Sequence, residues 1–571
     1  MKKNIIIMAL AAWSLCANAQ ADGSIRLNQV GYTPKQEKIV VIDQTAPKKM
    51  SVVDQNGKVV AKPKILRTAA SPWSGKKRTV VQVPGLTTEG SYTFRCGKES
   101  MPLVVKAGAL HELSKEALKM FYYMRTAVPI ERQYAGEYAR PAGHPDNQVL
   151  VHPAAASRLR PGGTVISSPG GWYDAGDYNK YVVNSSFSIG MMLASYEQNR
   201  DYFKQLEVNI PESNNATPDI LDEMMFNLEW LLTMQDPSDG GVYHKLTDPN
   251  FDGFVMPSDC HQQRYVVAKT TTAALDFAAV MAMAARIMEG NADYPDFSVK
   301  AANAAVRAYA WAQSHPTAYY RQNQLNERFE PKVFTGAYDD ENATDEFFWA
   351  STELYMLTCN EQYRDEVIKY RPASFARPVW GQVSALGVYE WLSADDDQMR
   401  VWAMDIIKTY CDQLIAGVEK SNFQAPCGDR KSDFGWGCLA EEFCAPALTL
   451  LFADTYIEPG KYRHHAQQNI DYVLGRNALG YCYVTGFGQK SPMHPHHRLS
   501  EADGITAPVP GMLVGGPNPM QQDKGDQLVY TSNYPDESYI DHTASYASNE
   551  IAINWNASLL AVVSWLDAIM Q

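Results

Sequence analysis

The change of residue pattern near residue 108 constrains the fold more than any other feature of the sequence. Before it, short runs of β-branched and aromatic residues, such as 39–42, 79–83 and 91–95, alternate with turns. Runs that recur at spacings of roughly ten residues are typical of a small β-sandwich. We therefore predict such a domain over residues 24–107.

The region 110–571 has the periodicity of helices. In the segment 217–232, Thr217 and Pro218 form a capping pair, and apolar residues follow at helical spacing. The segment 270–288 is apolar almost all round, which favours a helix buried between layers. The alternation of half-buried and fully buried helices predicts two concentric rings, an all-α barrel. A solenoid is the alternative, but no fixed-period repeat supports it.

The first residues have the pattern of an export signal. A positively charged start precedes an apolar run over 5–15, and small residues just before residue 20 supply a cleavage site. The run is too short to span a bilayer, and no later stretch is long enough to do so. We predict a signal peptide over residues 1–19 and a protein that is periplasmic or secreted. Cys16 offers a lipid-anchored alternative, but the bulky residues ahead of it fit that signal poorly.

The charge balance limits the class of partner. The chain has 51 Lys and Arg against 64 Asp and Glu, a net charge of −13. A nucleic-acid partner is not expected, because such binding depends on neutralising phosphates with basic side chains. Tyr outnumbers Phe by 32 to 19, and flat rings with a polar tip suit a surface for sugars. The nine cysteines show neither a CxxC pair nor the spacing of a metal finger.

The segment 170–181 carries the first candidate for chemistry. Asp174 and Asp177 stand three residues apart, directly after Trp172 and Tyr173. Paired carboxylates can position a water molecule and take its proton. The alternative is a turn in which the two Asp side chains cap backbone amides, and this is the commoner meaning of an isolated Asp-x-x-Asp.

Two adjacent histidines and an arginine, His496, His497 and Arg498, form the second candidate. A metal site is one interpretation, but it needs three or four convergent ligands, and adjacent histidines rarely point at one ion. A cluster of hydrogen-bond donors for sugar hydroxyls fits better, with Arg498 as a rigid fork.

The third candidate contains Asp541, Tyr546 and Glu550. Apolar residues follow Glu550, and a desolvated carboxyl has a raised pKa and stays protonated as an acid. The alternative is a glutamate in a first helical turn, where the helix dipole favours it. An acid of raised pKa together with a pair of aspartates and a water is the set of groups that inverting glycoside hydrolysis needs.

Taken together, these motifs resemble glycoside hydrolase family 9, the cellulase family with an (α/α)6 barrel. Residues 170–177 match the family pattern Gly-Gly-Trp-(His/Tyr)-Asp-Ala-Gly-Asp, and 495–498 end its histidine signature. The final signature is met over 539–557. Residues 25–32 resemble the opening of the immunoglobulin-like domain that precedes many such barrels. One position departs from the family's histidine signature, because Cys482 stands where Ser, Thr or Val is usual.

The resemblance implies a role for each matched residue. Asp177 is the catalytic base, Asp174 helps to hold the water, and Glu550 is the general acid. Asp541 and His496 are further active-site residues. The residues expected to bind the substrate are Arg498, Tyr546, Trp436, Trp172, Tyr173 and His497.

The resemblance also bears on metals, although the chemistry requires no cofactor. Many barrels of this type hold a structural zinc with cysteines in the patterns RCG and CH, but here Thr126 and Gly143 stand in those places. Only His144 remains, so zinc is not expected. Calcium is common in the family, and Asp339, Asp340 and Asp345 offer hard oxygen ligands. A solvated acidic loop is the alternative.

The predicted function is an inverting endo-β-1,4-glucanase that acts on soluble glucans such as xyloglucan, mixed-linkage glucan or amorphous cellulose. The acid and base carboxyls are expected to lie roughly 6.5–9.5 Å apart, which leaves room for the water. An exo-acting β-glucosidase or glucosaminidase is the alternative within the family, and a non-catalytic glycan-binding protein is the alternative outside it. The β-sandwich is expected to brace the barrel. The sequence does not decide the oligomeric state.

Overall fold

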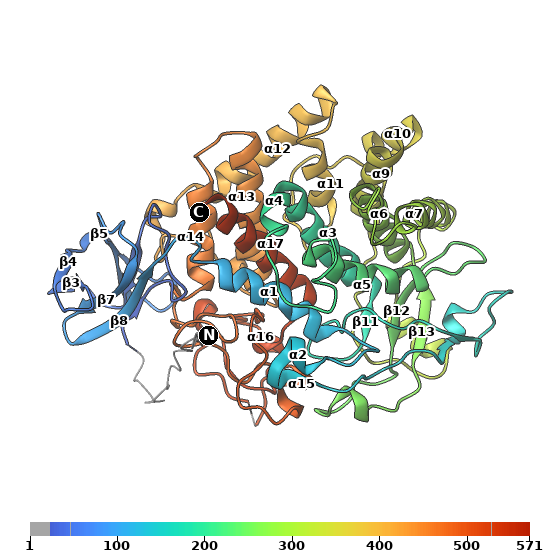
Figure 1. Ribbon diagram of the computed structural model, residues 1–571, viewed down its shortest axis with the longest axis horizontal. Coiled ribbons are helices and arrows are strands. Elements are labelled where there is room, and N and C mark those ends of the chain that lie inside the picture. Colours follow the sequence, from blue (N-terminus) through green and yellow to red (C-terminus); the bar gives the residue numbers. More distant parts are fainter. Residues whose placement is uncertain (1–22, 46, 527, 571) are drawn as a thin grey trace, which may run out of the picture.

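The computed structural model describes residues 23–45, 47–526 and 528–570. The predicted signal peptide, residues 1–19, lies outside these residues. The described chain has two parts, a β-rich domain and a mostly helical domain (Figure 1). No helix in the described ranges is both long enough and apolar enough to cross a membrane.

The β-rich domain consists of two four-stranded antiparallel sheets. The first has the order β1-β2-β6-β5 and contains Ile25–Arg26, Ile39–Ile42, Lys77–Gln82 and Lys64–Ala70. The second has the order β4-β3-β7-β8 and contains Val59–Ala61, Met50–Val53, Gly90–Cys96 and Glu99–Val105. Apolar side chains from both sheets, Val40, Val81, Phe94 and Leu103 among them, form one buried cluster. The predicted small sandwich is therefore present.

Helices dominate the rest of the chain, as the periodicity predicts. The long ones are α1 His111–Met124, α3 Val182–Gln198, α5 Asp219–Thr233, α6 Thr271–Ile287, α7 Phe297–Ser314, α9 Thr344–Thr358, α10 Glu361–Tyr370, α11 Ser384–Trp391, α12 Asp397–Ile415, α13 Ala445–Tyr456, α14 Arg463–Val473 and α17 Ile553–Ile569. The short ones are α2 Arg132–Ala135, α4 Arg200–Phe203, α8 Gln322–Arg328, α15 Arg498–Ala502 and α16 Tyr546–Asn549. Helix α6, which the sequence marks as apolar all round, is buried from Thr271 to Ala285.

The prediction of an all-α second domain is wrong in one respect. A five-stranded sheet of order β10-β9-β13-β12-β11 lies within the helical domain. Its strands are Val165–Ile166, Val149–Val151, Tyr265–Lys269, Tyr243–Thr247 and Lys180–Tyr181. Strands this short, drawn from segments far apart in the chain, leave no recurring pattern for sequence reasoning to detect. The sheet matters for the site because β11 leads directly into α3.

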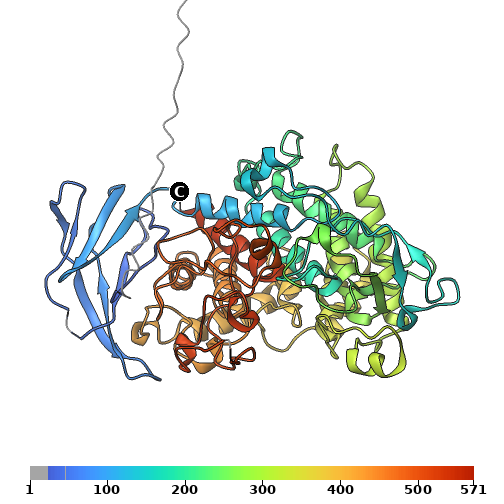
Figure 2. The ribbon, with the colours of Figure 1, turned by 90° about the horizontal axis from the view of Figure 1, so that it is seen from below.

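The β-rich domain adjoins the orange and red segments of the helical domain (Figure 2). The contacts between the two domains include polar ones. The Gln29 amide donates to the Leu474 carbonyl at 2.9 Å, and Gly475 lies so close that an added Cβ would be 2.5 Å from the Leu27 carbonyl oxygen. Further along, the Arg78 guanidinium forms an ion pair of 3.1 Å with Asp536, and both side chains are almost completely buried. A buried ion pair between domains fixes their relative position.

Candidate active site

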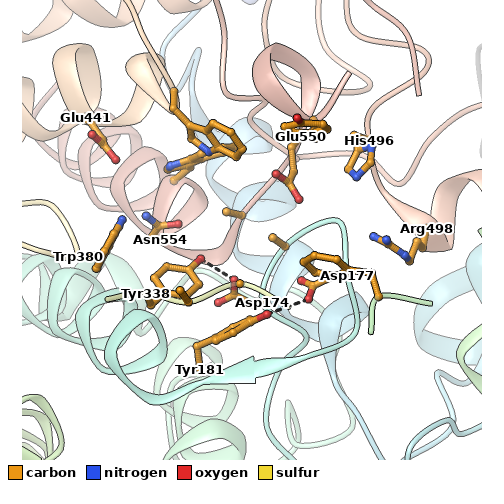
Figure 3. A pocket seen from close by; sticks show the side chains of 18 residues that line it. Asp174, Asp177, Tyr181, Tyr338, Trp380, Glu441, His496, Arg498, Glu550 and Asn554 are labelled. Carbon is orange, nitrogen blue, oxygen red and sulfur yellow. Dashed lines mark hydrogen bonds between the residues drawn. The ribbon is translucent and has the colours of Figure 1, made fainter. Parts of the chain in front are cut away.

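A cavity of about 730 Å³ lies in the helical domain. Segments far apart in the sequence line it: the loop before β11, the loop before α9, the turn before α13, and the segments around α15 and α16. Figure 3 shows that their side chains converge, with Glu550 facing Asp174 and Asp177 across the space. The three predicted carboxyls thus share one cavity.

The two aspartates are buried and receive separate sets of hydrogen bonds. Asp174 accepts from Asn184 Nδ2 at 2.7 Å and from the Tyr338 hydroxyl at 2.6 Å. Asp177 accepts from Asn179 Nδ2 at 2.5 Å and from the Tyr181 hydroxyl at 3.2 Å. Burial, and then the charge of Asp177, raise the pKa of Asp174 to about 8. Asp174 therefore keeps a proton near neutral pH.

A glycine brings this aspartate loop close to Glu550. A Cβ added to Gly176 would lie 2.2 Å from the His496 carbonyl oxygen and 3.1 Å from Glu550 Oε1. Burial, and then the charge of Asp177, raise the pKa of Glu550 well above its usual range. Glu550 therefore has the property expected of a general acid, a proton that it retains near neutral pH.

Arg498 and His496 lie beside the loop on the same side of the cavity (Figure 3). Arg498 Nη1 donates to the Gly176 carbonyl at 2.7 Å, and its Nε donates to the Asp252 carbonyl at 2.8 Å. His496 Nδ1 lies 2.6 Å from the Thr543 carbonyl, which fixes that nitrogen as the donor. Burial lowers the pKa of His496 to about 4, so its ring is neutral in ordinary conditions.

Aromatic side chains form the walls. Trp436 and Tyr546, both predicted, are partly exposed and lie 5.6 Å apart between ring centres. The lining residues that sequence reasoning missed include Phe251, Tyr338, Trp380 and Glu441. Trp380 stands in a loop rich in Pro and Gly, which was an available signal. No comparable loop composition marked Glu441 in the sequence.

Three predicted substrate-binding residues cannot have that role. Trp172 and Tyr173 are completely buried, and His497 is 1% exposed. Trp172 Nε1 donates to Glu223 at 2.9 Å inside the core. His497 Nδ1 lies 2.9 Å from the Ser500 hydroxyl. Since none of these rings reaches the cavity, none can stack on a sugar.

Asp541, predicted as an active-site residue, does not line the cavity. Its carboxylate accepts from the backbone amides of Met493 and His494, both at 2.8 Å, and from Asn549 Nδ2 at 3.1 Å. It therefore ties the histidine segment to the segment that carries Glu550. This is a positioning role, one step removed from the chemistry.

The acidic segment proposed for calcium is partly assembled. Asp340 and Asp345 gather with Glu346 and with Asp276 of α6, whereas Asp339 is exposed. Both carboxylate oxygens of Asp276 and one each of Asp340, Asp345 and Glu346 are buried and accept no hydrogen bond within the described chain. The second oxygen of Asp345 accepts from the Val383 amide at 2.7 Å. Burial and mutual repulsion raise the pKa values of Asp276 and Glu346 well above their usual range. Oxygen donors of this kind suit a hard cation, but no three of these residues have ligand atoms within 4.8 Å of one another, so a bound ion would require the carboxylates to draw closer.

Known proteins resemble the chain over nearly its full length. It is 54% identical over 557 residues to a xyloglucan-specific endo-β-1,4-glucanase of Bacteroides ovatus, with 96% of this chain and 94% of the relative covered. It is 30% identical over 573 residues to endoglucanase D of Acetivibrio thermocellus, with 97% and 85% covered. A solved Bacteroides ovatus family 9 structure superposes with a TM-score of 0.91 at 51% identity, covering 96% of this chain and 99% of that one.

Two family models match in the order in which the domains occur. The cellulase N-terminal Ig-like domain matches residues 20–101, and the glycosyl hydrolase family 9 model matches residues 111–563. The second match covers most of the chain, including all three carboxyls of the cavity. The chain belongs to glycosyl hydrolase family 9 and carries the family's N-terminal Ig-like domain.

Proposed function

We propose that this enzyme is an inverting endo-β-1,4-glucanase in which Glu550 is the general acid and Asp177 the general base. The observation that carries the proposal is the placement of Glu550 opposite the aspartate pair in one cavity (Figure 3). Glu550 protonates the leaving glycosidic oxygen. Asp177 takes a proton from a water that attacks the anomeric carbon from the opposite face, so the configuration inverts.

The neighbouring groups support this division of roles. Asp174 keeps a proton near neutral pH because its pKa is raised to about 8. A protonated Asp174 leaves the role of proton acceptor to Asp177 and can itself orient the water. Arg498, held by the Gly176 carbonyl, places a fixed positive charge beside the loop that carries both aspartates.

Soluble xyloglucan is the substrate that we favour. The support is the 54% identity to an enzyme named as specific for xyloglucan. The wide cavity with partly exposed Trp436 and Tyr546 suits flat sugar rings. An exo-acting β-glucosidase or glucosaminidase stays the alternative, and product analysis separates the two.

The helices are proposed to close as an (α/α)6 barrel. Contacts link α3 to α6, α6 to α9, α9 to α11, α13 to α17 and α17 back to α3. Tyr389 of α11 stacks on Phe452 of α13 at 4.0 Å, which joins the remaining neighbours. Helices α1, α5, α7, α10, α12 and α14 each contact one or more of these six from outside. Two rings of six are the arrangement that this pairing favours.

Two further properties follow as proposals. We place the enzyme outside the cytoplasm, on the strength of the export signal in residues 1–19. We also propose that Asp276, Asp340, Asp345 and Glu346 bind calcium, which would neutralise their unpaired buried oxygens. Dialysis against a calcium-selective chelator should then lower Tm, and added calcium should restore it. An unchanged Tm would contradict the calcium site.

The test of function is early-product chromatography on xyloglucan, carboxymethylcellulose, mixed-linkage glucan and cello-oligosaccharides. An endoglucanase gives mixed oligosaccharides and a rapid fall in viscosity, with xyloglucan cut fastest. Release of monosaccharide alone would establish the exo alternative. NMR of the first product should show the α-anomer, and a β-anomer would refute inversion. Glu550→Gln is the inactive control for all four substrates.

A further inference from the structure

A half-buried cluster beside the active site has the donors of a transition-metal site. His144, Asp252 and Cys260 each offer one ligand atom, and these atoms all lie within 4.8 Å of one another. No other group of three or more His, Cys, Asp or Glu residues in the described ranges meets that condition. Cys260 is a free thiol. Nitrogen, sulfur and carboxylate oxygen are the donors that Zn²⁺ prefers.

His144 is held with one ring nitrogen free for a ligand. Its Nδ1 lies 2.9 Å from the Tyr173 hydroxyl, whereas Nε2 is buried and has no hydrogen-bond partner among the residues that the structure describes. An imidazole with one nitrogen hydrogen-bonded and the other unpaired is the arrangement in which histidine binds metals.

A second carboxyl adjoins the cluster. Asp248 is 1% exposed, and its Oδ2 lies 3.7 Å from Arg264 Nη1 in an ion pair. Asp248 and Asp252 interact directly. Asp248 is not one of the three residues whose ligand atoms lie within 4.8 Å of one another, so it borders the cluster and is not counted as a ligand.

These donors differ from the cysteine set whose absence led us to expect no zinc. Thr126 and Gly143 occupy the two positions where the family has cysteines, and the structure leaves no space for a side chain at Gly143. A Cβ added to Gly143 would lie 2.5 Å from Pro257 Cβ. The loop 248–260 therefore packs directly against the segment that carries His144, and it brings ligand atoms of Asp252 and Cys260 to within 4.8 Å of a His144 ring nitrogen.

We propose that His144, Asp252 and Cys260 bind a divalent transition-metal ion of the Zn²⁺ class. The ion would fasten the loop 248–260 to the active site, because the Asp252 carbonyl accepts the Arg498 hydrogen bond and Phe251 lines the cavity. Binding would release the Cys260 thiol proton. The competing arrangement is metal-free, with Asp252 held by side-chain hydrogen bonds to Asp248 and Cys260.

Cobalt reports on the thiolate directly. The full enzyme is treated with a chelator that removes transition metals, and Co²⁺ alone is then titrated while the absorption spectrum is recorded. We expect one equivalent to produce a near-ultraviolet thiolate-to-cobalt band and strong visible bands of tetrahedral Co²⁺. Zn²⁺ should displace it one for one and raise Tm. A wild-type enzyme that shows no thiolate band, or that binds no stoichiometric Zn²⁺, would overturn the proposal.

Variants locate the ion. Cys260→Ser should abolish the thiolate band, and Asp252→Asn should weaken Co²⁺ affinity by about tenfold or more. Cys359→Ser is the matched control, because Cys359 is also a free cysteine but is exposed and outside the cluster. A band that survives Cys260→Ser, or disappears in Cys359→Ser, would refute the assignment. Circular dichroism checks that each variant is folded. The readouts do not depend on glucan hydrolysis, so they are independent of the proposed function.

Discussion

Replacing Gly176 by alanine tests whether the approach of the aspartate loop to Glu550 sets the rate of hydrolysis. The added Cβ would lie 2.2 Å from the His496 carbonyl oxygen, and that oxygen is backbone. A non-bonded carbon and oxygen need about 3.2 Å, so the loop or the His496 segment must shift by roughly 1 Å. The shift would separate Asp177 from Glu550 and weaken the hydrogen bond from Arg498 Nη1 to the Gly176 carbonyl.

A displacement of roughly 1 Å in a catalytic arrangement costs about 10²-fold in rate. We expect Gly176→Ala to lower kcat on xyloglucan by about that factor or more, because the loss concerns the alignment of acid and base. Initial rates of reducing-end release give kcat and KM, and circular dichroism confirms the fold. Gly435→Ala is the matched control, since no heavy atom lies within 4 Å of its added Cβ. A Gly176→Ala enzyme with kcat within a few-fold of wild type would refute the reasoning.

Three further substitutions or measurements test separate parts of the structure. Glu550→Gln should lower kcat by about 10²–10⁴-fold. In the wild type the protonated form of Glu550 is the active one, so turnover should persist above the ordinary glutamate pKa and fall as pH rises through the raised pKa. A loss of activity at the ordinary glutamate pKa would contradict this. Trp172→Phe should lower the free energy of unfolding in urea by about 1–3 kcal/mol, because Glu223 loses a buried hydrogen-bond donor, and it should leave KM unchanged. A raised KM with unchanged stability would show instead that Trp172 binds the substrate. Arg78→Met should lower the free energy of unfolding by about 3–5 kcal/mol, since it leaves Asp536 buried without its partner, and equal stability would show that the interface does not brace the fold.

Local pattern was sufficient for the features that depend on neighbours in the chain. The change from strand to helix, the buried helix 271–287, and the location of Asp174, Asp177 and Glu550 all follow from short segments. The predictions that were wrong concern features that depend on contacts between distant segments. Trp172 is buried because Gly171, with φ of 82°, turns the chain so closely against α5 that a Cβ would lie 2.7 Å from the Trp230 ring. Periodicity carries no information about such a contact.

Burial raises the pKa values that make this site suitable for acid–base chemistry, and the hydrogen bonds to each carboxyl modify that effect. Desolvation raises the pKa of Asp174 and of Glu550 and favours their neutral forms. Each aspartate receives its own donors, from Tyr338 and Asn184 on Asp174 and from Tyr181 and Asn179 on Asp177. The donors to Asp174 lower its pKa, but burial and the charge of Asp177 outweigh them. Glu550 has no comparable side-chain donor within the described residues and keeps its proton. One charged carboxyl in the pair and one neutral carboxyl opposite is the protonation state from which an inverting hydrolysis begins.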